Sequence, residues 1–137
     1  MLRVVRRLMP KLSINDFKER RYDYRDAENA HILSRPKRIW LDYLNKNRER
    51  IAYVSYYTDN GQIALFDIRE DYQRRGLGKQ ILSKVQTDLI DNKCKEMWVV
   101  AHKDHPFWPN ASFTYRDPAH PSVRTDEPSD GYFKQII

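Results

Sequence analysis

The sequence has little cysteine and little glycine: Cys94 is the single cysteine, and there are four glycines in 137 residues. One cysteine excludes an intrachain disulfide framework and favours a reducing compartment. No apolar run approaches the roughly 18 residues needed to cross a bilayer. Residues 1–8 carry arginines but lack the apolar stretch of a signal peptide. We therefore expect a cytoplasmic protein that does not enter membranes.

Charge is plentiful and unbalanced. Lys and Arg outnumber Asp and Glu by 25 to 19, giving a net charge of +6. Such a balance favours an anionic partner, and a phosphate-bearing cofactor satisfies it as well as a nucleic acid does. The length predicts a single domain over residues 1–137, with an irregular, proline-punctuated segment at 116–137 that returns as a last strand near 131–137. Monomer and homodimer both remain open.

The first half of the chain is predicted to form an opening strand and short surface helices, followed by further strands. Residues 1–8 predict an opening strand, and Ser13 predicts the cap of one or two short polar helices within 14–33. Alternating apolar residues predict strands at 39–44 and 51–57. Asn60-Gly61 then predicts a tight hairpin turn into a strand at 62–68.

The second half contains a glycine turn and a strong amphipathic helix. Residues 77–92 predict a helix with one apolar stripe, formed by Leu77, Ile81, Leu82, Val85, Leu89 and Ile90. Residues 96–101 predict a buried strand. Strand, glycine turn, helix and strand together predict a β-α-β unit whose two strands are parallel.

The turn Gln73-Arg74-Arg75-Gly76-Leu77-Gly78-Lys79 carries the most specific chemistry. A helix start leaves backbone N–H groups unpaired and carries the positive end of the helix dipole. Glycines let ligand oxygens approach the main chain, and the flanking basic side chains add charge. The pattern therefore predicts a site for a pyrophosphate or a similar anion. It is neither a P-loop nor a complete dinucleotide fingerprint.

Here the sequence resembles the GCN5-related N-acetyltransferases. Their signature, Gln/Arg-x-x-Gly-x-Gly/Ala after the fourth strand, is matched by Gln73, Gly76 and Gly78. The resemblance extends over residues 51–101 in element order. It implies an α/β fold: a mixed, mostly antiparallel sheet, flanked by helices, whose fourth and fifth strands splay apart.

The resemblance also implies acetyl-CoA as co-substrate. The pyrophosphate would lie on the turn from Gln73 to Lys79, and the backbone of Ile68 and Arg69 would hydrogen-bond the pantetheine. The implied cofactor-binding residues are Ile68, Arg69, Gln73, Arg74, Arg75, Gly76, Leu77, Gly78, Lys79 and Asn110.

The proton-transfer groups are less constrained by the sequence. Family members use a tyrosine in the helix after strand five, and the spacing of residues 111–115 makes Tyr115 the candidate general acid. Asp67 and His102 are candidate bases or water relays, with Glu70 and His105 as further possibilities. A metal held by His102, Asp104 and His105 lacks a distant ligand pair, so we expect no metal.

The sequence thus predicts an acetyl-CoA-dependent N-acetyltransferase whose acceptor is a primary amine on a protein or a small molecule. Two alternatives remain. The acceptor is a nucleic acid or charged tRNA, bound by basic residues (Arg3, Arg6, Arg7, Lys37 and Arg38) and by stacking on Phe107 and Trp108. Otherwise the chain binds CoA or a partner protein without turnover.

Overall fold

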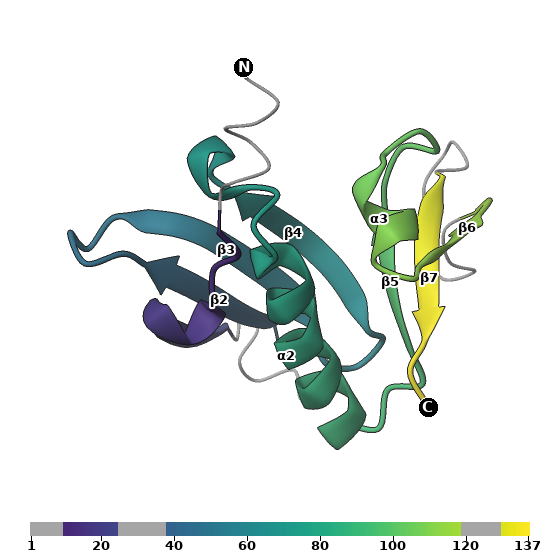
Figure 1. Cartoon of the computed structure of the whole chain (residues 1–137). Coiled ribbons are helices and arrows are strands. Elements are labelled where there is room, and N and C mark those ends of the chain that lie inside the picture. Colours follow the sequence, from purple (N-terminus) through teal and green to yellow (C-terminus); the bar gives the residue numbers. More distant parts are fainter. Residues whose placement is uncertain (1–9, 25–37, 119–129) are drawn as a thin grey trace, which may run out of the picture.

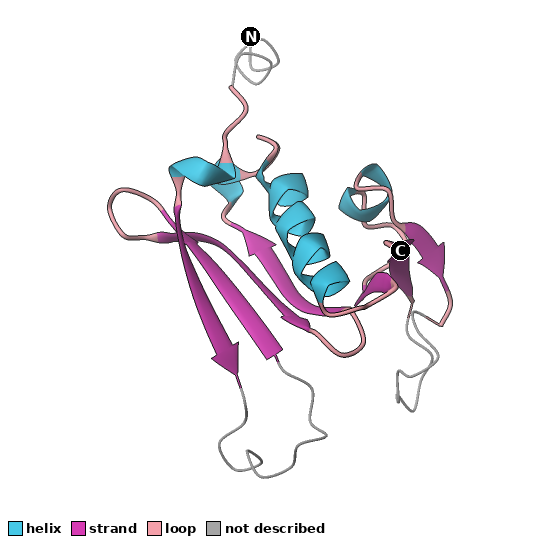
Figure 2. Cartoon of the chain, turned by 90° about the horizontal axis from the view of Figure 1, so that it is seen from below, coloured by secondary structure: helices cyan, strands magenta, loops and turns pink. Residues whose placement is uncertain are grey.

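The computed structural model of the chain describes residues 10–24, 38–118 and 130–137. The strand expected at residues 1–8 lies outside this part. The described strands form one seven-stranded sheet in the order β1-β2-β3-β4-β5-β7-β6. Helix α2 (Leu77–Asp91) lies on one face of β2, β3 and β4, and the short helix α3 (Phe107–Asn110) lies beside β5 (Glu96–Val100), as Figures 1 and 2 show. The predicted mixed sheet with flanking helices is confirmed.

Strand β1 (Lys18–Tyr24) stands where surface helices were expected, so that prediction is wrong for the described residues. Ser13 does cap a helical turn, but this 3₁₀ turn, η1 (Ile14–Asp16), is three residues long. β1 then pairs antiparallel with β2 (Arg38–Leu44). The strand carries polar side chains on both faces, and on the inner face Arg21 contacts Asp88 of helix α2 at 3.3 Å. Because both faces are polar, the sequence of β1 lacks the alternation of apolar and polar residues that would have predicted a strand.

Strands β3 (Arg50–Tyr57) and β4 (Gln62–Ile68) form the expected antiparallel hairpin. The connection spans residues 58–61 rather than a two-residue turn, and Gly61 alone of the Asn60-Gly61 pair has a positive φ, 78°. A Cβ on Gly61 would lie 2.0 Å from the carbonyl oxygen of Glu96. Glycine here therefore permits both the turn and the close passage of β5.

Strand β5 runs parallel to β4, as the β-α-β pattern predicted, but the ladder contains only the pairs Gln62↔Trp98 and Ile63↔Val99. The register between β3 and β4 shifts at the same level, which leaves Ala64 without a Cα partner. Beyond this bulge β4 and β5 diverge (Figure 1). The splay between the fourth and fifth strands is thus a property of this chain.

The core lies between α2 and the sheet. The predicted stripe of α2 is buried except for Ile90, which is 37% exposed, and the helix ends at Asp91 with Asn92 as its C-cap. Opposite it lie Ile39, Leu41, Val54 and Tyr56. Within the described residues, no helix has the length and apolar character needed to span a bilayer.

The end of the chain completes the sheet. The expected last strand is β7 (Gly131–Gln135), which pairs antiparallel with β5 and with β6 (Thr114–Arg116). Tyr115 therefore lies on the sheet's edge strand and not in a helix, which corrects the sequence expectation. Helix α3 is one turn long: Pro106 is its N-cap residue, and Ser112, with a positive φ of 69°, breaks the helical conformation after Asn110.

Candidate functional site

The glycine turn between β4 and α2 has the backbone conformation of an anion cradle. A 3₁₀ turn, η3 (Glu70–Tyr72), leads into it. Arg74 and Gly76 both adopt positive φ, 60° and 86°, and Gly76 is the N-cap residue of α2. No side chain caps the helix. The ring of N–H groups at the helix start is therefore left for a ligand.

The hydrogen-bond pattern supports this. In the described part of the chain, no acceptor pairs with the backbone N–H groups of Arg74, Arg75 or Gly76. The N–H groups of the first helical residues, Leu77 and Gly78, have no partner in the preceding turn either, since an α-helix supplies none. Together with the helix dipole and the neighbouring basic side chains, these donors fit a pyrophosphate.

Gln80 holds the turn in place, a role that the sequence did not reveal. Its side-chain amide donates to the carbonyls of Leu12 (2.7 Å) and Gly76 (3.1 Å), and its Oε1 accepts from the N–H of Ile14 (2.9 Å). Arg75 adds to the same contact, since its Nε donates to the carbonyl of Pro10 at 3.1 Å. The contacts with Pro10, Leu12 and Ile14 join segments more than sixty residues apart, so no local pattern could have indicated them.

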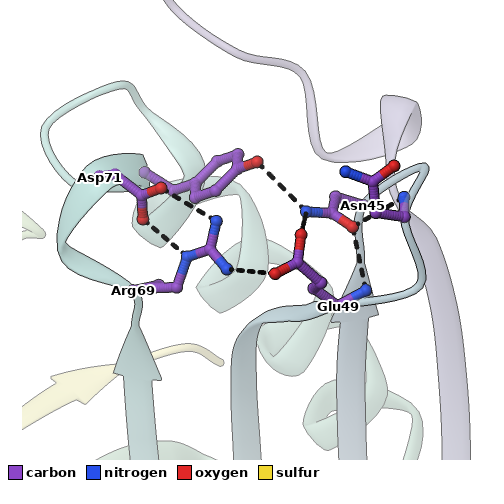
Figure 3. Close-up of polar contacts among 6 residues, drawn as sticks. Asn45, Glu49, Arg69 and Asp71 are labelled. Atoms are coloured by element: carbon purple, nitrogen blue, oxygen red, sulfur yellow. Dashed lines mark hydrogen bonds and ion pairs between the residues drawn. The ribbon is translucent and has the colours of Figure 1, made fainter.

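Arg69, at the end of β4, belongs to a polar network beside the turn (Figure 3). Its guanidinium donates to both carboxylate oxygens of Asp71, at 2.7 and 2.9 Å, and contacts Glu49 at 3.4 Å. Glu49 in turn accepts from Asn45 at 3.1 Å. The hydrogen bond from Arg69 lowers the pKa of Asp71, and those from Asn45 and Arg69 lower the pKa of Glu49. The network ties the β2–β3 connection to the glycine turn.

The backbone of β4 presents groups to the opening between β4 and β5, from Ile68 as expected but from Phe66 in place of Arg69. The N–H of Arg69 donates to the carbonyl of Ile51, and its carbonyl accepts from Tyr72, each at 2.8 Å. Because hydrogen-bonded pairs alternate along an antiparallel ladder, the groups that point toward β5 belong to Phe66 and Ile68. The carbonyl of Ile68 accepts from Gln73 at 2.7 Å. Phe66 and the N–H of Ile68 thus line the opening, and Phe66 was missed.

An aromatic cluster fills the side of the opening next to α2. Phe107 of α3 stacks on Phe66, with ring centroids 5.5 Å apart, and Trp108 packs between Phe66 and Phe113. Trp108 is only 4% exposed. Trp108 is therefore not available for stacking on nucleic-acid bases in this conformation, and Phe107 is partly buried against the same cluster.

A cavity of about 320 Å³ lies between α2 and the C-terminal strands. Lys79 and Asn110, which were both predicted to bind the cofactor, line it together. The other lining residues are Leu82, Ser83, Gln86, Met97, Ala111, Ser112, Phe113 and Lys134. The start of α2, the end of α3 and a second lysine, Lys134, thus line the same cavity.

The three proton-transfer candidates do not meet at one point. Tyr115 lies on β6, which β7 and β5 separate from β4, and Lys103 places its ammonium 5.5 Å from the Tyr115 ring. His102, next to Lys103, is exposed and contacts Asp104 at 3.8 Å. Asp67 is exposed on β4 opposite Tyr53, on the sheet face away from α2. Desolvation, then a hydrogen bond with Asp130, raises the pKa of Tyr115.

Metal ligation finds no support in the described residues, which contain no group of three or more His, Cys, Asp or Glu side chains placed to hold an ion. His102 and Asp104 are neighbours in one exposed loop, and each is bordered by solvent.

Comparisons with known proteins bear on the whole arrangement. The model of the acetyltransferase (GNAT) family matches residues 4–109. No curated protein matches the sequence. Among solved structures, a GNAT-family acetyltransferase from Staphylococcus aureus Mu50 superposes with a TM-score of 0.61 at 14% identity, covering 88% of this chain and 100% of its own.

Two further similar structures were solved with coenzyme A. An aminoglycoside 6'-N-acetyltransferase has a TM-score of 0.57 at 11% identity, covering 83% of this chain and 82% of its own. The PaiA N-acetyltransferase from Thermoplasma acidophilum has a TM-score of 0.56 at 14% identity, and the match covers 70% of this chain and 59% of the PaiA chain. At these identities the structures establish the fold, while the family match spans most of the chain. The chain therefore belongs to the GNAT acetyltransferase family.

Proposed function

We propose that this protein transfers an acetyl group from acetyl-CoA to a primary amine of a protein or a small molecule. The observation that carries the proposal is the glycine turn: Arg74, Arg75 and Gly76 offer N–H groups without internal partners at the start of α2, beside a sheet that opens between β4 and β5. Family membership and the coenzyme A complexes of two similar structures support the choice of ligand.

The residues present fit acetyl-CoA in three respects. The turn supplies N–H donors and positive charge for a pyrophosphate. The backbone groups of Phe66 and Ile68 supply donors and acceptors for amide groups between β4 and β5. Lys79 and Lys134 line the neighbouring cavity, where a further phosphate would be attracted.

In the proposed reaction, the nitrogen of a neutral amine attacks the thioester carbonyl, the C–S bond breaks, and the products are an amide and the free thiol of CoA. The amine must lose a proton and the thiolate must gain one. Tyr115 is the proposed proton donor, because a phenol carries its proton at neutral pH. His102 and Asp67 are the candidate acceptors. The rest of the rate acceleration would come from holding the amine and the thioester in the right relative orientation at the opening between β4 and β5.

A CoA-binding protein without turnover is the second candidate function. The observation in its favour is the position of Tyr115, two strands away from β4. Release of free thiol from acetyl-CoA by the wild type separates the two. In an active enzyme, Tyr115→Phe should then lower kcat and leave CoA affinity unchanged if the hydroxyl donates the proton.

The test combines calorimetry with an assay for released thiol. Wild-type protein is titrated with CoA, then incubated with acetyl-CoA and lysine peptides, peptides with a free N-terminus, and polyamines. We expect binding and thiol release with one acceptor class. The double variant Arg75→Glu/Gly78→Glu should lose CoA binding, whereas Lys93→Glu, which changes a lysine beyond the far end of α2, should retain it. Unchanged affinity in the double variant would falsify the proposed site.

A further inference from the structure

The face of the sheet opposite α2 carries a row of side chains that runs straight across four strands. Tyr22 of β1 pairs with Trp40 of β2, Trp40 with Ser55 of β3, and Ser55 with Leu65 of β4. We refer to these four residues as the cross-strand row. Its two ends are exposed, Tyr22 to 39% and Leu65 to 44%. Large apolar side chains are thus displayed on a surface that no described helix covers.

The middle of the row is held rigid. The rings of Trp40 and Tyr53 are stacked, with centroids 5.2 Å apart and planes 8° from parallel. The indole Nε1 of Trp40 donates to Asp42 at 2.7 Å, and the guanidinium of Arg50 lies 4.5 Å from the Tyr53 centroid. Flat rings whose orientation is fixed in advance lose little entropy when another flat ring stacks on them.

Basic side chains border the cross-strand row on both sides. Arg20 and Arg50 hold the carboxylate of Asp42 between them, at 3.8 and 3.6 Å, while about half of each side chain remains exposed. On the other side, Arg38 donates to Ser55 at 2.7 Å. One buried carboxylate thus orders two guanidinium groups, and the pair retains a surplus positive charge.

We propose that this face binds single-stranded nucleic acid. Aromatic side chains beside basic ones suit it, because bases stack on the rings while phosphates contact the cations. In a duplex the base faces are already stacked, so the row discriminates against double strands. An acidic protein would use the arginines but has no need of Tyr22 and Trp40. This inference does not rest on the proposed acetyltransferase function, since none of its residues belongs to the glycine turn or to the cavity beside α2.

The test is fluorescence anisotropy of labelled 12-nucleotide U and dT strands with the full chain at 50 mM KCl, repeated at rising salt. We expect micromolar binding whose log–log salt slope is about −2 to −3, as three or four phosphate contacts give. A 12-base-pair duplex should bind about tenfold more weakly. Tryptophan emission should be quenched, and because Trp98 and Trp108 are 2% and 4% exposed, the quenching reports Trp40.

Neighbouring residues of β1 provide a matched control. Arg20 and Arg21 are similarly exposed, 47% and 44%, but Arg20 faces the cross-strand row and Arg21 faces α2. Arg20→Gln and Tyr22→Ser should each weaken binding about fivefold or more, and Arg21→Gln less than twofold. Tyr22 is exposed, so its variant should remain folded even where Trp40→Leu does not.

Equal losses for Arg20→Gln and Arg21→Gln would contradict the proposal, because the effect would then be net charge alone. So would an absence of binding at 50 mM KCl, or equal affinity for duplex. A polyglutamate peptide that displaces the labelled nucleic acid, and that binds the Tyr22→Ser variant as tightly as the wild type, would indicate an acidic protein partner. Sedimentation as a dimer that Tyr22→Ser dissociates would assign the face to a second copy of this chain. Either result overturns the proposal.

Discussion

The ring of Phe107 lies directly on Gly78, so closely that a Cβ on Gly78 would approach Phe107 Cε2 to 2.8 Å. The contact joins α3 to the start of α2 across the opening of the sheet. It explains why a glycine stands inside the first turn of a helix, where it is otherwise unfavourable. The contact also identifies α3 as one wall of the proposed cofactor site.

Gly78→Ala should therefore destabilise the protein by about 1 kcal/mol, because overpacking against Phe107 exceeds the gain in helix propensity. In a Phe107→Ala background the same substitution should be neutral or stabilising. The measurement is urea unfolding of both single variants and the double variant. A coupling energy near zero would show that the Phe107 ring moves away without cost.

Charge reversal at the cavity should reduce CoA affinity. Lys134 lines the cavity from β7, far from Gly78 in sequence. We expect Lys134→Glu to weaken CoA binding about tenfold, because one favourable contact with an anion becomes repulsive. Calorimetry should show no change for Lys93→Glu. An undiminished affinity of Lys134→Glu would place the phosphates of CoA elsewhere.

The network of Figure 3 predicts a loss of stability in acid. The pKa values of Asp71 and Glu49 are lowered in the folded state by the hydrogen bonds from Arg69 and Asn45. A lowered folded pKa contributes stability above the unfolded pKa of about 4, and this contribution is lost as the pH falls through the folded value. We expect the free energy of unfolding to be flat from pH 7 to 5 and to fall below pH 4.

The double variant Asp71→Asn/Glu49→Gln should lose less stability than wild type between pH 5 and pH 3. Its controls are Asp91→Asn and Glu70→Gln, whose side chains are exposed outside this network. Parallel pH profiles of the wild type and the double variant would contradict the prediction.

Cys94 should be unreactive in the folded protein. Its side chain is buried, its thiol donates to the carbonyl of Thr58 at 3.1 Å, and burial raises its pKa. Since the thiolate is the reactive form, Ellman's reagent at pH 8 should modify Cys94 only at the rate of unfolding. Stopped-flow absorbance with and without urea measures this. Fast modification of the native protein would show that the connection between the C-terminal end of α2 and β5 opens locally.

Much of the fold was predictable because local patterns and tertiary structure agree there. The apolar stripe of α2 has one periodicity, and burial follows it. The runs of β-branched and aromatic residues in β3 and β4 mark these segments as strands, although β3 is buried on both faces over much of its length. β1 was mispredicted because its side chains are polar on both faces. Their stabilising partners, such as Asp88 for Arg21, lie on elements distant in sequence. Tyr115 was placed in a helix by analogy, whereas pairing with β7 makes it a strand residue.

The sequence by itself determined the glycine turn and the start of α2, because glycine spacing and a helix start act over a few adjacent residues. It also determined the β-α-β order and hence the parallel pairing of β4 and β5. Only the tertiary structure decided which groups face the opening. The strand register makes the backbone of Phe66, and not that of Arg69, face the opening between β4 and β5. Packing places the ring of Phe107 on Gly78, and the side chain of Gln80 donates to the carbonyl of Leu12. Such contacts depend on where distant segments meet, and hydrophobic periodicity carries no information about that.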